Sequence, residues 1–294
     1  MKQQNKSYLF ALSAILFWST IGSALKITLR YITFAELLFF ASIVSFLVIF
    51  TSIIVSRKTP LLFTQSFPEI LKSALLGLIN PFLYYLVLLK AYDILPAQEA
   101  GTLNYIWPVV LVLLSIPLLK QKIGFLSIIA ILISFAGTII IGTKGNILSL
   151  KFDHPTGVFL ALGSAVFWSL FWIYNVKDKR DELIKLLLNF GFGLIYIFIY
   201  LIFTNGFNPI NFYGLAGSVY VGIFEMGLTY ILWLKAMKYT STTAKISNLV
   251  FLSPFISLIF IRFTVGEDIL FSTIIGLVFI VGGILMQRLV AAKD

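Results

Sequence analysis

A short segment of the chain, residues 98–108, carries several chemically capable side chains inside a mostly apolar run. Glu99 supplies a carboxyl group, and Asn104 supplies an amide. Tyr105 and Trp107 add aromatic rings, while Pro108 lacks a backbone N–H and interrupts a helix. Carboxyl and amide groups can hold a proton or the polar end of a small molecule, and aromatic rings can stack on its apolar part. The combination is typical of a binding site for a small organic molecule.

A second acidic residue, Glu225, lies in the middle of another apolar run. An ionised carboxylate within hydrocarbon is costly unless it faces water, a partner or a bound proton. Its helical neighbours include Ser218 and Gly222, and such small residues suit a cavity or a close helix contact. The corresponding face of an earlier run carries Asn80 and Tyr84. Two interpretations of Glu225 stay open: a functional proton carrier, or a protonated carboxyl group that makes only a structural hydrogen bond.

The residue types exclude several classes of active site. The sequence has no cysteine and one histidine, His154, which lies in a polar connection. We therefore expect no metal site and no thiol nucleophile. Neither a Walker sequence nor a Gly-x-Ser-x-Gly sequence occurs. The sequence predicts a protein that is not an enzyme, needs no cofactor and does not hydrolyse ATP by itself.

The elements that must position these residues are apolar helices. Of 294 residues, 60% are hydrophobic and 12% are charged, and the mean hydropathy is +1.01. Runs of about 20 apolar residues match a helix that crosses about 30 Å of hydrocarbon. The predicted fold class is an all-α integral membrane protein with ten transmembrane helices. Their expected ranges are 8–27, 34–55, 70–92, 97–119, 125–142, 156–174, 184–203, 213–236, 243–263 and 270–289.

The formal net charge of +10 is better explained by membrane orientation than by binding to nucleic acid. Lys and Arg concentrate in connections on the side of the N-terminus, such as 57–58, 120–122 and 177–180. The positive-inside rule places that side in the cytoplasm. We expect a multi-pass protein of the cell (cytoplasmic) membrane with both termini in the cytoplasm. The connection around Lys144 is then outside.

The chain consists of two related halves. LSAILFWS, residues 12–19, is similar to LGSAVFWS, residues 162–169, and Pro108 aligns with Pro254 at nearly the same spacing. Five helices per half is an odd number, so the second half must enter the membrane from the opposite side. We predict two inverted five-helix repeats, residues 1–146 and 147–294. This topology is typical of secondary transporters that work by alternating access.

Aromatic residues well inside the runs complete the predicted site. The Phe-Trp-Ser sequences that open the two halves supply two indoles, and we expect them to surround one cavity together with Trp107. The predicted substrate-binding residues are Trp18, Asn80, Tyr84, Asn104, Tyr105, Trp107, Trp168 and Tyr230. The predicted coupling or gating residues are Glu99, Glu225, Pro108 and Pro254. Glu99 has a second interpretation as a water-facing residue, and each proline either exposes carbonyls beside the site or merely kinks its helix.

Taken together, these features resemble the drug/metabolite transporter superfamily, EamA type. The resemblance covers nearly the whole chain and includes the prolines of the fourth and ninth helices and Gly266-Glu267 before Gly282-Gly283. Residues 104–108, Asn-Tyr-Ile-Trp-Pro, are similar to the Asn-Tyr-x-Trp-Pro of YddG-like aromatic amino acid exporters. The first half has Lys-Gln-Lys at residues 120–122 in place of Gly-Glu, so no symmetric role is implied for Glu267.

The resemblance implies a secondary transporter that exports amino acids, aromatic or other neutral ones, or similar small metabolites. Proton coupling through Glu225 is the hypothesis, and an uncoupled facilitator or an uptake carrier of the same fold is the alternative. The expected partners are a small-molecule substrate, the lipid bilayer and, in the coupled form, protons. No nucleic acid is expected, and the sequence is compatible with a monomer or an oligomer.

Overall fold

The computed structural model describes residues 3–120, 124–147, 152–204, 206–209, 211–239 and 249–291. Within these ranges the regular structure is helical, without a strand. Eight helical segments are long and apolar enough to cross a membrane, and two shorter apolar helices, Leu249–Val265 and Phe271–Met286, follow them. The predicted all-α membrane architecture is confirmed. The first part of the ninth predicted run, 243–248, lies outside the described residues.

The spans are of two kinds, continuous and interrupted. The continuous ones are α1 (Gln3–Thr28), α2 (Phe34–Val55), α7 (Phe125–Gly142), α8 (Pro155–Lys177), α9 (Glu182–Phe203) and α14 (Phe271–Ala291). The third span consists of α3 (Phe67–Gly77), η2 (Leu78–Leu83) and α4 (Tyr84–Ile94), and the fourth of α5 (Ala97–Asn104) and α6 (Trp107–Leu119). The eighth consists of α10 (Phe212–Val221), η3 (Gly222–Gly227) and α11 (Leu228–Tyr239). The ninth contains η4 (Leu249–Leu252), α13 (Ser253–Phe260) and η5 (Ile261–Val265), and the short η1 (Thr59–Thr64) connects α2 to α3.

The third and eighth spans each contain a π-helical turn near the centre, η2 and η3. In η2, Pro81 lacks an N–H, and Asn80 leaves the helical conformation with φ −148° and ψ 121°. No proline occurs in η3, which begins at Gly222 and ends at Gly227. Asn80 and Glu225, which the sequence placed at equivalent positions, lie in these two turns. π-Turns inside α-helices are frequent at functional sites.

The fourth and ninth spans are interrupted just before a proline. Pro108 is the second residue of α6, and Pro254 is the second residue of α13. The first N–H groups of a helix have no partner within it, so a proline is tolerated there. As the sequence predicted, both prolines interrupt their spans.

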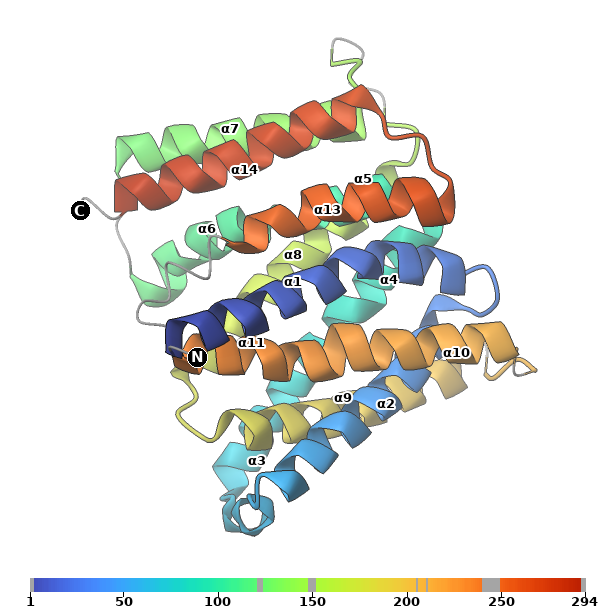
Figure 1. The fold of residues 1–294 in the computed structure, drawn as a ribbon, viewed down its shortest axis with the longest axis vertical. Helices are drawn as coiled ribbons and strands as arrows, with labels where there is room; N and C mark the ends of the chain where they lie inside the picture. Colours follow the sequence, from blue (N-terminus) through green and yellow to red (C-terminus); the bar gives the residue numbers. More distant parts are fainter. Residues whose placement is uncertain are drawn as a thin grey trace.

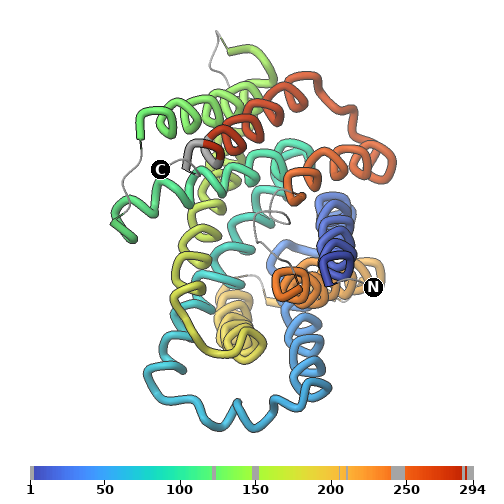
Figure 2. Tube along the Cα trace, turned by 60° about the vertical axis from the view of Figure 1, so that its left-hand side comes forward, coloured from blue at the N-terminus to red at the C-terminus, as the bar shows by residue number. Residues whose placement is uncertain are grey.

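Helix pairs early in the chain have counterparts among the later spans. The first span, α1, packs against α11 and α13, while the sixth span, α8, packs against α4 and α6. The pair α2 and α9 and the pair α7 and α14 are also in contact. Figures 1 and 2 both show α7 and α14 side by side at one end of the molecule, with the connection from α2 to α3 at the other end. Two related five-span halves would produce this exchange of partners.

Glycines allow the closest helix contacts in the same paired manner. A Cβ atom on Gly77 would lie 2.4 Å from the Asn189 carbonyl oxygen, and one on Gly222 would lie 2.5 Å from the Ala41 carbonyl oxygen. A side chain at either position would therefore clash with backbone. The third span is thereby held against the seventh, and the eighth against the second, next to the two π-turns.

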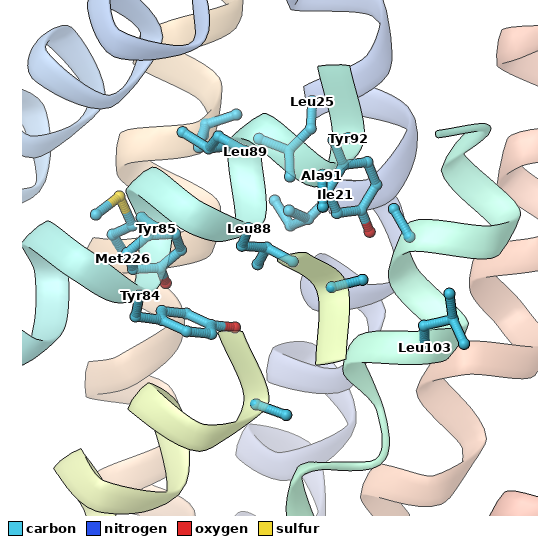
Figure 3. Packing of buried hydrophobic residues seen from close by; sticks show 14 of the residues in the cluster. Ile21, Leu25, Tyr84, Tyr85, Leu88, Leu89, Ala91, Tyr92, Leu103 and Met226 are labelled. Carbon is cyan, nitrogen blue, oxygen red and sulfur yellow. The ribbon is translucent and has the colours of Figure 1, made fainter. Parts of the chain in front are cut away.

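The part of the buried core that supports the site lies around α4. Figure 3 shows Tyr84, Tyr85 and Leu88 of α4 together with Ile21 of α1 and Met226 of η3. These residues come from the first, third and eighth spans. Packing from both halves therefore fixes the orientation of the two tyrosines.

Candidate functional site

A cavity of about 580 Å³ lies among the first, third, fourth, sixth, eighth and ninth spans. The predicted site residues in its lining are Trp18, Tyr84, Asn104, Tyr105, Trp107, Trp168, Glu225 and Pro254. Gln98, Thr102, Trp172 and Trp233, which the sequence did not single out as site residues, line it as well. The structure thus gathers residues from distant parts of the chain around one space.

Indole and phenol rings form much of the wall. The ring centroid of Trp168 lies 4.7 Å from that of Tyr84 and 6.4 Å from that of Trp107. Trp18 pairs with Trp233 of α11 at 5.5 Å between ring centroids. The expectation that the indoles of α1, α6 and α8 surround one cavity therefore matches the structure. Such walls suit a flat apolar ligand group.

Hydroxyl groups from other spans contact one backbone carbonyl at each of the two helix breaks. The Ser169 hydroxyl lies 2.9 Å from the Trp107 carbonyl oxygen and 2.7 Å from the Ala165 carbonyl oxygen, and its one proton serves both acceptors. The Tyr105 hydroxyl donates to the Val250 carbonyl at 2.5 Å. These bonds fasten the break of the fourth span to the sixth span and to the break of the ninth.

The orientation of the Asn104 amide is set by a chain of two hydrogen bonds. Asn104 Nδ2 donates to Ser164 Oγ at 2.8 Å, and Ser164 Oγ donates to the Ala161 carbonyl at 2.6 Å. Because the serine proton is used on Ala161, the serine oxygen must accept from the amide nitrogen. The oxygen of the Asn104 side chain, which lines the cavity, is therefore left as an acceptor.

Glu225 lines the cavity from η3 and accepts a hydrogen bond from the Tyr85 hydroxyl at 3.0 Å. The ring of Tyr84 lies 4.6 Å from that of Tyr85, so α4 supplies both a donor to the carboxylate and a neighbouring aromatic surface. Among the described residues, no Lys or Arg forms an ion pair with Glu225. The cavity therefore contains an acidic group without a basic partner in that part of the chain.

The remaining predicted site residues, Asn80, Glu99, Pro108 and Tyr230, are outside the cavity lining. Asn80 is fully buried in η2, and its amide has no hydrogen-bond partner within the described residues. Tyr230 is buried beside Trp168, with ring centroids 6.2 Å apart. Glu99 is only 3% exposed and lies 3.9 Å from Lys144 Nζ, so it does not face solvent as one interpretation required.

One end of the cavity, here named the Gln98 end, is closed by residues 266–270. The Glu267 carboxylate accepts the backbone N–H of Ala97 at 2.8 Å and that of Gln98 at 3.2 Å. It thereby caps the N-terminus of α5, where a negative charge is favourable. The Gln98 side chain donates to the Asp268 carbonyl at 2.8 Å and accepts the N–H of Leu270 at 3.0 Å.

The opposite end, the Lys177 end, is lined by Leu119, Val176 and Lys177. Val176 is 74% exposed, whereas Ala97 at the Gln98 end is fully buried. The lining is therefore exposed at the Lys177 end and buried at the Gln98 end.

An ion-pair cluster lies in the connection beside the Lys177 end. Arg180 Nη2 donates to Asp178 Oδ2 at 2.6 Å and to Ser73 Oγ at 2.9 Å. Burial alone would raise the pKa of Asp178, but hydrogen bonds from Arg180 outweigh it and lower the pKa to about 2. The pair stays charged at neutral pH and holds the connection after α8 against α3.

Comparison with known proteins identifies the chain. The profile of the EamA-like transporter family matches it twice, over residues 5–143 and residues 155–288. The chain belongs to the EamA-like transporter family. It is therefore a multi-pass membrane protein of a transporter family, and the resemblance drawn from its sequence is confirmed.

Individual relatives of this EamA-like transporter carry transporter names. The uncharacterized transporter YvbV of Bacillus subtilis is 26% identical over 227 residues, which cover 75% of this chain and 71% of YvbV. An uncharacterized transporter of Clostridium kluyveri is 30% identical over 174 residues, 56% of this chain and 55% of the relative. The aromatic amino acid exporter YddG of Ancylobacter novellus is 26% identical over 167 residues, 55% of this chain and 57% of YddG. The last two matches span little more than half of those relatives.

A solved crystal structure has the same fold. It superposes with a TM-score of 0.66 at 22% sequence identity, and the superposition covers 98% of each chain. The arrangement of helices around the cavity is therefore one that has been seen in a crystal.

Proposed function

We propose that this EamA-like transporter exports amino acids, aromatic or other neutral ones, or similar small metabolites across the cell membrane by alternating access. The observation that carries the proposal is the cavity, because residues of both halves bound it and its wall combines aromatic rings with Asn104 and Glu225. Its volume of about 580 Å³ lies in the range of small-molecule sites. The YddG protein, which is named an aromatic amino acid exporter, is a relative and supports the same substrate class.

Alternating access requires two related parts that move against each other around the site. We assign these parts to two inverted repeats, residues 1–146 and 147–294, with both termini in the cytoplasm. The exchange of helix partners between the halves supports this assignment. With this topology, the exposed Lys177 end faces the cytoplasm and the buried Gln98 end faces outward.

Proton coupling through Glu225 is part of the proposal. A carboxyl group inside a membrane protein marks an ion or substrate pathway by default, and this one lines the cavity without a basic partner in the described residues. An uncoupled facilitator of the same fold would need no such proton transfer. For such a facilitator, the direction of transport in the cell follows the concentration gradient of the substrate.

The test is transport by purified protein in lipid vesicles. Vesicles are loaded with single radiolabelled amino acids, and efflux is followed with and without an imposed pH gradient. We expect aromatic amino acids to leave these vesicles faster than they leave protein-free vesicles. Efflux should be faster still when the pH gradient is imposed. Transport of no member of an amino acid panel would contradict the substrate class, while transport that ignores the gradient would favour the facilitator.

The topology gives a separate prediction, and the cysteine-free sequence makes it easy to test. Single cysteines introduced as Lys179→Cys and Lys144→Cys should react with a membrane-impermeant thiol reagent from opposite sides. Intact cells should allow labelling of Lys144→Cys, and opened cells should allow labelling of both. If intact cells label both positions, the inverted arrangement is wrong.

A further inference from the structure

We propose that Glu225 and Asn104 bind the ammonium group of the substrate, so that the site selects molecules with a protonated amine beside a flat apolar group. The inference rests on the proposed function and specifies which chemical group that site recognises. It assigns different parts of the substrate to different parts of the cavity wall.

The first argument is the free bonding capacity of Glu225. Its Oε1 accepts the Tyr85 hydroxyl at 3.0 Å, and no described residue donates to its second oxygen. The side chain lines the cavity, so a bound molecule can reach this oxygen. An ionised carboxylate accepts several hydrogen bonds, and those from a charged donor are the strongest. A substrate ammonium supplies three such donors.

The second argument is a second acceptor near the first. The bond from Asn104 Nδ2 to Ser164 leaves the amide oxygen as an acceptor on a side chain that lines the cavity. Tyr84 links the two acceptors through its neighbours: its ring lies 4.6 Å from that of Tyr85, which donates to Glu225, and its hydroxyl is a hydrogen-bond neighbour of the Asn104 side chain. Both acceptors therefore face one region of the cavity, next to α4.

The third argument is the surrounding aromatic surface. The ring centroid of Trp168 lies 4.7 Å from that of Tyr84 and 6.4 Å from that of Trp107. Faces of such rings attract cations and also stack on flat apolar groups. A protonated amine with an aromatic body can satisfy both requirements at once. An amide nitrogen in place of the amine would bring neither the charge nor the additional donors.

Backbone carbonyls at the helix breaks contribute less to this site. The Trp107 carbonyl oxygen lies 2.9 Å from the Ser169 hydroxyl, and the Val250 carbonyl accepts from Tyr105. Both already have a donor from the protein, so the side chains of Glu225 and Asn104 are the stronger candidates for an ammonium.

The experiment compares N-ethyltryptophan with N-acetyltryptophan as competitors of radiolabelled tryptophan binding to the purified full chain. The two compounds have similar size and the same carboxylate, but only the first has a protonated amine. We expect N-ethyltryptophan to compete within a few-fold of tryptophan and N-acetyltryptophan to be at least about tenfold weaker. In Glu225→Gln, the preference for the amine should fall to within about threefold. Glu69→Gln, at the start of α3 and outside the cavity lining, is the matched control and should keep the full preference.

The outcomes separate this inference from the proposed function. Equal competition by the two compounds in the natural protein would overturn the ammonium site while leaving amino acid transport in place. An amine preference that survives in a folded Glu225→Gln variant would assign the ammonium to another acceptor and also overturn the inference. Absence of tryptophan binding and transport would instead contradict the proposed function.

Discussion

The π-turns η2 and η3 lie at corresponding places in the third and eighth spans but carry different side chains. Each lies near the centre of its span with a packed glycine at its start, Gly77 just before η2 and Gly222 as the first residue of η3, and each glycine contacts the backbone of another helix. In η2, Asn80 is buried away from the cavity and has no hydrogen-bond partner in the described residues. In η3, Glu225 lines the cavity and binds Tyr85 of the other half. Both spans are thus interrupted at their centres, while only η3 places an acidic group in the cavity lining.

This difference predicts that the two turns have separable roles. A π-turn widens a helix and re-aims its side chains, so two of them at equivalent positions let both halves adapt around the cavity. The charge in η3 would then serve recognition or coupling, whereas η2 would serve shape. Substitutions at the two positions can test this division directly.

The largest effect is expected for Glu225→Gln. The neutral amide resembles a protonated carboxyl group but cannot release a proton, so pH-driven accumulation should be abolished while substrate exchange between compartments persists. Vesicle assays at raised substrate concentration measure both activities. Full retention of pH-driven transport in a folded variant would leave the facilitator as the better description.

The counterpart substitution, Asn80→Leu, is the control for that comparison. A buried amide without a partner costs about 1 to 3 kcal/mol, so an apolar residue of similar size should leave stability unchanged or raise it by up to about that amount. Transport and its pH dependence should stay within about twofold. A loss as severe as that of Glu225→Gln would show that the two turns share one function.

An intermediate effect is expected at the cavity wall. Trp107→Ala removes one aromatic surface and should weaken transport of bulky amino acids more than that of small ones, with an affinity loss of about 1 to 3 kcal/mol for the bulky ones. Asn104→Ala should weaken all amino acids together, because it would contact their common part. Concentration-dependent transport across an amino acid panel measures both. If neither folded variant alters any member of the panel, the binding site lies elsewhere.

The smallest effect on transport chemistry, but a clear one on stability, is expected at the glycines beside the turns. Gly77→Ala and Gly222→Ala place a Cβ 2.4 and 2.5 Å from backbone oxygens, so each should destabilise the fold by about 1 to 3 kcal/mol. Gly282→Ala meets no atom within 4 Å and should be neutral or stabilising. Thermal unfolding followed by tryptophan fluorescence compares the three. Equal melting temperatures for all of them would contradict the close packing described for the paired spans.

Much of this architecture was predictable, because the length of a hydrophobic run and the position of a proline determine the local helix without reference to the rest of the chain. The spans and the interruptions at Pro108 and Pro254 follow from those two properties. The turn η3 was not predictable, because no proline marks it and its geometry depends on packing against α2. The cap that Glu267 places on α5 joins residues distant in sequence, and the Gly266-Glu267 pair alone did not indicate its target.

The sequence predicted the kind of site better than it predicted which residues line that site. Intramembrane aromatic and polar residues pointed to a cavity, and Trp18, Trp107 and Trp168 do line one. The spacing of residues in the sequence shows which of them share one face of a helix. It does not show whether that face points toward the cavity, because packing against neighbouring helices sets the rotation of the helix. Asn80 therefore shared the predicted depth of Glu225 yet lies outside the cavity lining.

The closure at the Gln98 end has a consequence for the rate of the transport cycle. If access alternates, the hydrogen bonds of Glu267 and Gln98 must break and reform in every cycle. At about 1.5 to 3 kcal/mol for each bond to a charged group and about 1 kcal/mol for each other bond, breaking them would cost roughly 5 to 10 kcal/mol. A barrier of about 17 kcal/mol corresponds to a few events per second, so breaking these bonds would supply a large share of such a barrier. Glu267→Gln should accordingly shorten the cycle in single-turnover measurements, and an unchanged rate would locate the slow step in another part of the transporter.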